Sequence, residues 1–77
     1  MPGIKFLSGQ ELRDILKANG FVFVSQKSSH MKLRRKIEVG SEIITFTAIV
    51  PDHKTLKIGT LSSIVRQSGL QRELFEK

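Results

Sequence analysis

The fold of this chain is decided by residues 30–39, which read His30-Met31-Lys32-Leu33-Arg34-Arg35-Lys36-Ile37-Glu38-Val39. Apolar residues recur at alternate positions, as Met31, Leu33 and Ile37, and Arg35 breaks their series. Successive side chains of a β-strand point to opposite faces of a sheet. The stretch therefore predicts a strand with one face in a core and one charged face, which carries His30, Lys32, Arg34, Lys36 and Glu38.

Two further strands are expected beside this one. Residues 21–24, Phe-Val-Phe-Val, are β-branched or aromatic and too few for a helix, and residues 25–29 form a polar stretch typical of a turn. On the other side, Gly40-Ser41 marks a tight turn before an Ile-, Thr- and Phe-rich segment from Ile43 to Val50. Because the joins are short, the three strands are expected to pair as an antiparallel meander.

A helix is predicted on each side of the meander. The first begins at a capping box formed by Ser8 and Glu11 and ends at Gly20. The second begins between residues 57 and 60 and ends at Gly69. Each has one apolar stripe, with Leu12, Ile15 and Leu16 in the first helix and Leu61, Ile64 and Val65 in the second. The predicted fold class is therefore α+β, with a three-stranded antiparallel sheet and both helices on one face.

The 77 residues allow one domain, assigned to residues 1–70, with a short polar tail at 71–77 that contains Leu74 and Phe75. This tail is expected to form one frayed helical turn or a partner contact. The chain has no cysteine, which excludes disulfides and zinc–thiolate sites. Residues 1–7 lack the apolar core of a signal peptide, and no segment has about 20 apolar residues, so we expect a cytoplasmic protein without a membrane span.

Charge is the first indication of a partner. Thirteen Lys and Arg residues face seven Asp and Glu residues, a net charge of +6, and a basic domain of this size most often binds nucleic acid. The sequence has no phosphate-binding loop and no carboxylate cluster suited to a two-metal nuclease. We expect no metal and no small-molecule cofactor. There is no Tyr or Trp, so contacts to phosphate and sugar are favoured over base stacking.

His30 is the residue best placed for chemistry, because the strand pattern puts it beside Lys32, Arg34 and Lys36. In RNA cleavage a base takes the proton of the 2′-OH, an acid protonates the leaving 5′-oxygen, and cations stabilise the phosphate charge. From the residues alone, an exposed histidine without a role is the favoured interpretation, and the basic face could serve only to discourage aggregation. His53 is interpreted as an ordinary loop histidine. The fold could also bring further cations to the strip, namely Lys27, Lys54, Lys57 and Arg66.

Residues 8–70 resemble the HicA (YcfA-like) family of toxins. The resemblance rests on five blocks that occur in the family's order and spacing. They are Ser8-Gly9-Gln10-Glu11-Leu12, Leu16-Lys17-Ala18-Asn19-Gly20-Phe21, Gln26-Lys27-Ser28-Ser29-His30, Leu56-Lys57-Ile58-Gly59-Thr60-Leu61-Ser62-Ser63-Ile64 and Gln67-Ser68-Gly69-Leu70. The pattern departs from the family at Ser28, where glycine is common and permits a backbone conformation that serine adopts less readily.

The resemblance implies a double-stranded-RNA-binding-domain-like fold and a toxin of a type II toxin–antitoxin system that cleaves mRNA. It implies that His30 is the catalytic residue and that a HicB-type antitoxin binds the toxin and covers its active site. The expected RNA-binding residues are Lys27, Ser28, Ser29, Lys32, Arg34 and Lys36. The main alternative is a double-stranded-RNA-binding module without catalysis. A third reading is a protein-interaction domain that uses Leu74, Phe75 and an exposed strand.

Overall fold

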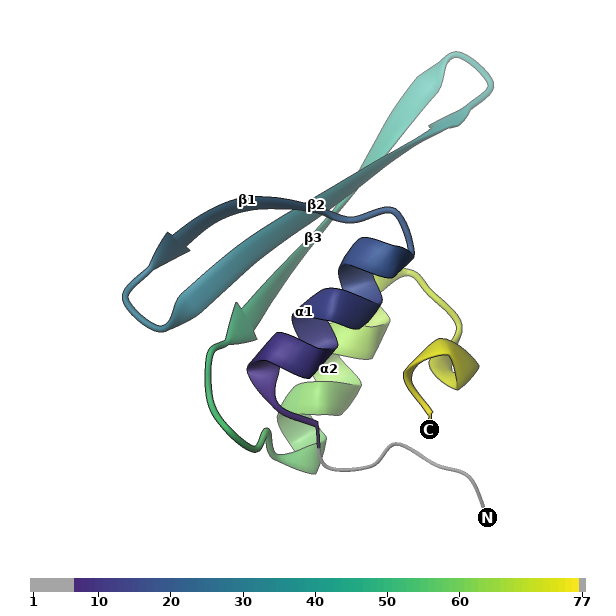
Figure 1. Cartoon of the computed structure of the whole chain (residues 1–77). Coiled ribbons are helices and arrows are strands. Elements are labelled where there is room, and N and C mark those ends of the chain that lie inside the picture. Colours follow the sequence, from purple (N-terminus) through teal and green to yellow (C-terminus); the bar gives the residue numbers. More distant parts are fainter. Residues whose placement is uncertain (1–6, 77) are drawn as a thin grey trace.

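Two helices and a three-stranded sheet follow one another in the predicted order, with a short 3-10 helix after them (Figure 1). The structure is a computed structural model that describes residues 7–76, so residues 1–6, considered above for a signal peptide, lie outside it. Its elements are α1 (Gly9–Ala18), β1 (Val22–Lys27), β2 (His30–Val39), β3 (Glu42–Pro51), α2 (Ile58–Ser68) and η1 (Arg72–Phe75). The predicted α+β class is confirmed.

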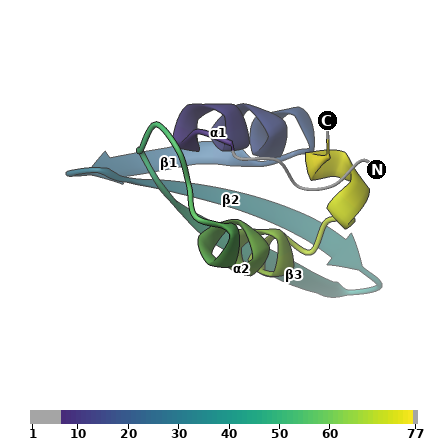
Figure 2. The ribbon, with the colours of Figure 1, turned by 90° about the horizontal axis from the view of Figure 1, so that it is seen from below.

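The sheet has the order β1-β2-β3 with antiparallel neighbours, and both helices lie on one of its faces (Figure 2). The alternation predicted for β2 is confirmed, because Met31 and Leu33 are buried beneath the helices. Their ladder partners Val50 and Ala48 are buried with them. The other face of the sheet, called the open face here, has no helix over it. No helix within residues 7–76 is long and apolar enough to cross a membrane.

The helix ends follow the predicted signals. At α1 the Ser8 hydroxyl accepts from the Glu11 N–H at 3.0 Å, and the Glu11 carboxylate accepts from the Ser8 N–H at 3.0 Å, which completes the capping box. Gly20 has a φ of 95° just after this helix, and Gly69 has a φ of 69° at the end of α2. Gly69 also lies against the Phe46 ring, where a Cβ would collide. Glycine is thus required there by both conformation and space.

The predicted limits of the first strand are wrong. Ser25, Gln26 and Lys27 were expected in a turn, but they belong to β1 and pair with Lys32, Met31 and His30 of β2. A register shift between Phe23 and Ser25 lets the strand continue past its apolar part. Polar residues are accepted because β1 is an edge strand that is exposed along its whole length. The turn is therefore only Ser28-Ser29.

Arg35 breaks the apolar series because it fastens α2 to the sheet. Its guanidinium lies 4.7 Å from the centre of the Phe46 ring and 5.6 Å from that of Phe21. One Nη donates to the carbonyl oxygen of Ser68 at 3.1 Å, in the last turn of α2. A cation is favourable at this end of a helix, where carbonyl groups carry partial negative charge. Arg35 therefore faces the helices, and the basic open face does not include it.

The tail after α2 contributes to the core. Phe75, in η1, is fully buried, and η1 contacts α1. Leu74 beside it is 43% exposed. Of the two expectations for this segment, a helical turn is thus observed, and one of its two apolar residues is used inside the domain.

Candidate nucleic-acid interface

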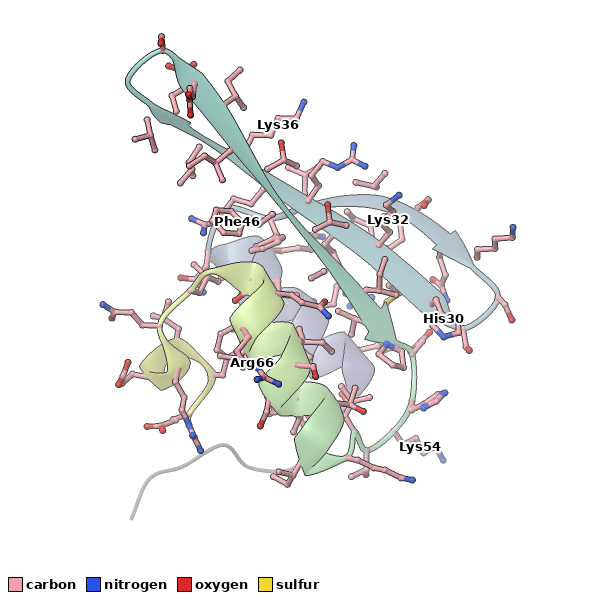
Figure 3. The ribbon with its side chains drawn as sticks, turned by 180° about the vertical axis from the view of Figure 1, so that it is seen from behind. His30, Lys32, Lys36, Phe46, Lys54 and Arg66 are labelled. Atoms are coloured by element: carbon pink, nitrogen blue, oxygen red, sulfur yellow. The ribbon has the colours of Figure 1, made fainter. Side chains whose placement is uncertain are left out.

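The register of the sheet brings the predicted basic residues onto one surface. Paired residues of neighbouring strands share a face. Lys27 pairs with His30, and from there the open-face positions of β2 continue with Lys32, Arg34 and Lys36. Figure 3 shows His30, Lys32 and Lys36 in a row along β2. We call these five residues, Lys27, His30, Lys32, Arg34 and Lys36, the basic strip.

His30 stands at one end of the strip, as the first residue of β2. Its neighbours on the ladder are Lys27 of β1 and Pro51 of β3, and its side chain is exposed. Within residues 7–76, no hydrogen bond or ion pair is formed by its side chain. An exposed imidazole beside an ammonium group can reach a phosphodiester from solvent and exchange a proton with it.

The turn that precedes His30 has an unusual backbone. Ser28 has a φ of 57°, and it is the only residue other than glycine with a positive φ in the described part of the chain. Its successor Ser29 has a negative φ, so the pair has the φ signs of a type II′ turn, which prefers glycine at its first central position. The conformation of Ser28 therefore costs about 1–2 kcal/mol relative to a right-handed one.

A second set of contacts holds this turn against the segment that follows β3. The amide nitrogen of Gln26 donates to the Ser28 carbonyl oxygen at 3.3 Å and to the Asp52 carboxylate at 3.2 Å. The backbone N–H of Asp52 donates to the Ser29 carbonyl oxygen at 2.6 Å. We call Gln26 and Asp52 the clamp. Sequence reasoning did not identify it, because the two residues are 26 positions apart and meet only through the pairing of three strands.

The segment from Asp52 to Lys57 joins the strip to the start of α1. The His53 carbonyl oxygen accepts from the Gly9 N–H at 2.8 Å, and a Cβ on Gly9 would collide with the Pro51 carbonyl oxygen. This contact uses the backbone of His53, while its side chain is exposed. Lys54 follows in this segment, between the end of the sheet where His30 lies and the start of α2 (Figure 3). Two hollows of about 270 Å³ flank the segment, which leaves an open surface for a large substrate.

Other features predicted from the sequence lie elsewhere. Arg66 lies on α2, on the helical side of the sheet, and does not extend the strip (Figure 3). Phe21 and Phe75 are buried, and Phe23 and Phe46 occupy ladder positions on the helical face, so the described open face has no aromatic ring. Within residues 7–76 no three His, Cys, Asp or Glu side chains cluster as metal ligands do. The surface offers positive charge, hydroxyl groups and one histidine.

Comparison with known families identifies the family of this chain. A family model described as HicA toxin of bacterial toxin–antitoxin matches residues 9–70, which include every helix and strand except η1. The chain belongs to the HicA toxin family. HicA proteins as a family are known as toxins with ribonuclease activity. Because the family belongs to toxin–antitoxin systems, a cognate antitoxin is implied as a partner. No curated protein and no solved structure matches the chain.

The match includes the turn in which this HicA protein departs from the common pattern. The positive φ of Ser28 is one that glycine adopts without steric cost, in agreement with the glycine that the resemblance leads us to expect at this position. Here serine occupies the same conformation, and the clamp holds it on both sides.

Proposed function

We propose that this HicA protein is a metal-independent endoribonuclease that cleaves mRNA, with His30 as general acid–base. The observation that carries the proposal is the position of His30, exposed at the end of the basic strip and next to a turn fixed by the clamp. The family supplies the expectation of RNA cleavage. The fold supplies one surface on which a cationic row and a proton-transfer group meet.

The proposed reaction begins when RNA binds along the strip through its phosphates. Lys27, Lys32, Arg34 and Lys36 would contact the backbone, which holds one phosphodiester against His30. His30 takes the proton of the 2′-OH, and the oxygen attacks the adjacent phosphorus. The P–O5′ bond breaks, the protonated His30 gives its proton to the leaving oxygen, and the products are a 2′,3′-cyclic phosphate and a 5′-OH. The ammonium groups stabilise the charge that develops on phosphate.

The hydroxyl groups of the turn have a supporting part in this proposal. Ser28 and Ser29 lie between Lys27 and His30, so their hydroxyls can reach the same phosphate.

Because mRNA is recognised through phosphate and sugar on a face without aromatic rings, we expect weak sequence selectivity. A HicB-type antitoxin would inhibit the toxin by covering the strip and His30.

The test is cleavage of a defined RNA in the presence of EDTA, with wild type, His30→Ala and His53→Ala compared. We expect His30→Ala to lose at least about 100-fold in rate, the range of a lost acid–base group. His53→Ala should retain most of the activity, because its described contact uses the backbone carbonyl. Replacing the ribose 5′ of the cut by 2′-deoxyribose should stop cleavage there.

The outcome also decides between this function and the non-catalytic alternative. If His30→Ala cleaves at the wild-type rate, the catalytic assignment is wrong. If neither protein cleaves but both bind duplex RNA with steep salt dependence, the chain is a binding module on the same fold. Circular dichroism of each variant shows whether a loss of rate reflects a loss of structure.

A further inference from the structure

Between Ile43 and Val50, the outer edge of β3 has none of the features that usually prevent strands from pairing between molecules. β3 is an edge strand of ten residues. No charged residue lies between Ile43 and Pro51, and no Lys or Arg lies between Ile37 and His53. Edge strands are normally protected by lysine, proline or a bulge. Pro51, at the last position of β3, is the only such residue here.

No other element within residues 7–76 covers the hairpin end of β2 and β3. β1 pairs with β2 only as far as Arg34, so residues 35–46 form a two-stranded ribbon that extends past the helices beyond Arg35 and Phe46 (Figure 1). The end of α2, Gly69, lies against Phe46, so this helix covers β3 from Phe46 towards Pro51. Val39, Ile43 and Ile44 on the ribbon are 55%, 64% and 39% exposed. A two-stranded ribbon of this kind is marginally stable without further contacts.

The backbone of β3 presents its free hydrogen-bonding groups at regular intervals. The two-residue turn Gly40-Ser41 closes on the pair Val39–Glu42, and along an antiparallel ladder the groups of successive residues point alternately towards and away from the partner strand. The N–H and C=O groups that point away from β2 are therefore those of Ile43, Thr45, Thr47 and Ile49. Pro51, next in this series, has no N–H.

The residue types at these four outward-pointing positions of β3 are the same in both chain directions. The order Ile, Thr, Thr, Ile is symmetric about Phe46, and all four side chains share the open face. A second copy that runs antiparallel with Phe46 opposite its counterpart would place Ile43 opposite Ile49 and Thr45 opposite Thr47. Cross-strand pairs of β-branched residues and of threonines stabilise a sheet. All outward N–H and C=O groups between Ile43 and Ile49 would be paired in this register.

We propose that two copies of this chain associate through the outer edges of β3, with this register, to form a continuous six-stranded antiparallel sheet. In the dimer, Ile44 of one copy lies beside Ala48 of the other, the part of β3 that α2 covers. Each α2 thus provides apolar contact for the ribbon of the other copy. The two open faces join into one surface with a His30 at each far end. The proposal is independent of RNA cleavage.

Cysteine pairs test the register directly, because the chain has no cysteine of its own. Hydrogen-bonded residues across an antiparallel pair have Cα atoms about 5.5 Å apart, within the range of a disulfide. We expect the Thr45→Cys/Thr47→Cys double variant to form a covalent dimer within minutes of mild oxidation. The matched control, Val22→Cys/Ser25→Cys on the edge strand β1, should react at least about tenfold more slowly.

Two edge variants test the association without crosslinking. Thr45→Pro removes one outward N–H and leaves the ladder with β2 complete, and Ile43→Lys adds the charge that natural edges carry. Sedimentation should show wild type reaching the dimer mass as its concentration rises, while both variants remain monomeric with unchanged circular dichroism. Should Thr45→Pro fail to fold, Ile43→Lys decides the question.

Three results would overturn the proposal. The first is a wild-type chain that stays monomeric up to about 1 mM. The second is crosslinking of the Thr45/Thr47 pair no faster than that of the β1 control. The third is a dimer that Ile43→Lys leaves intact. If the free chain stays monomeric and a strand of the antitoxin binds this edge, the proposal is also overturned. The edge is then assigned to the antitoxin instead of a second copy.

Discussion

β2 has a two-residue turn at each end, and the two turns share a backbone conformation but differ in sequence and surroundings. Ser28-Ser29 precedes the strand and Gly40-Ser41 follows it. The first residue of each has a positive φ, 57° at Ser28 and 63° at Gly40. At Gly40 the residue suits the angle, and a Cβ would meet nothing within 4 Å. At Ser28 the residue does not suit the angle, and the Gln26 side chain and the Asp52 N–H hold the backbone of the turn.

The difference indicates what each turn is for. The Gly40 turn reverses the chain and has no described contact with other elements, so local preference is sufficient to form it. The Ser28 turn carries His30 and the end of the basic strip, and its strained conformation is maintained by Gln26 and Asp52. Strain of this kind persists where the surroundings determine the backbone, and it is frequent at functional sites. Four tests can break or sharpen this comparison.

Removal of the clamp is expected to have the largest effect. Asp52→Ala and Gln26→Ala should each lower the cleavage rate by about 10- to 100-fold, because displacing a catalytic group by about 1 Å has a cost of that order. RNA affinity should change little, so kcat falls and KM does not. The double variant should lose no more than Gln26→Ala alone, since Gln26 makes both the contact with Asp52 and the side-chain contact with the turn. The control is Glu42→Ala, a carboxylate beside the other turn.

Gly40→Ala should have the next largest effect, and it should lower only the stability of the fold. The added Cβ meets no atom, so the cost of about 1 kcal/mol comes from the positive φ. For a domain of this size that corresponds to a fall of about 4–8 °C in Tm. Gly59→Ala, in α2 with equally open surroundings and no positive φ, should not lower Tm. Equal destabilisation by the two would show that conformation is not the cause.

Ser28→Gly, at the other turn, should increase the stability of the fold. Relief of the strained φ is partly offset by the greater entropy of glycine in the unfolded chain, which leaves a gain of about 0.5–1 kcal/mol. Urea denaturation measures this gain as a higher midpoint with an unchanged slope. A lower midpoint would mean that the serine hydroxyl contributes more than its backbone conformation costs.

The smallest effect is expected from single charges of the strip. Lys27→Ala should weaken RNA binding about two- to fivefold and lower the slope of log K against log salt by about 1, as expected for one lost phosphate contact. Glu38→Gln, on the open face at the other end of β2, should leave the slope unchanged. If both variants change the slope equally, RNA is not confined to the strip.

Local signals in the sequence were sufficient for most of the elements. The Ser8–Glu11 capping box, the glycines at 20 and 69, and the alternation in residues 30–39 all act within a few residues along the chain. The limits of β1 were predicted wrongly because Ser25, Gln26 and Lys27 have no strand signal of their own. They extend the strand because β2 offers hydrogen-bonding partners opposite them. Phe75 joins the core for a similar reason, since only packing against the folded domain buries it.

The candidate site divides in the same way. The sequence by itself determined that His30, Lys32, Arg34 and Lys36 share a face, because strand geometry has a period of two residues. Only the tertiary structure decided that Lys27 joins them and that Arg35 instead stacks between Phe21 and Phe46. The same holds for the contact of Gln26 with Asp52 across the sheet. Periodicity acts between neighbours in the chain, whereas these contacts need the register of three strands, which is set when the whole sheet closes on its core.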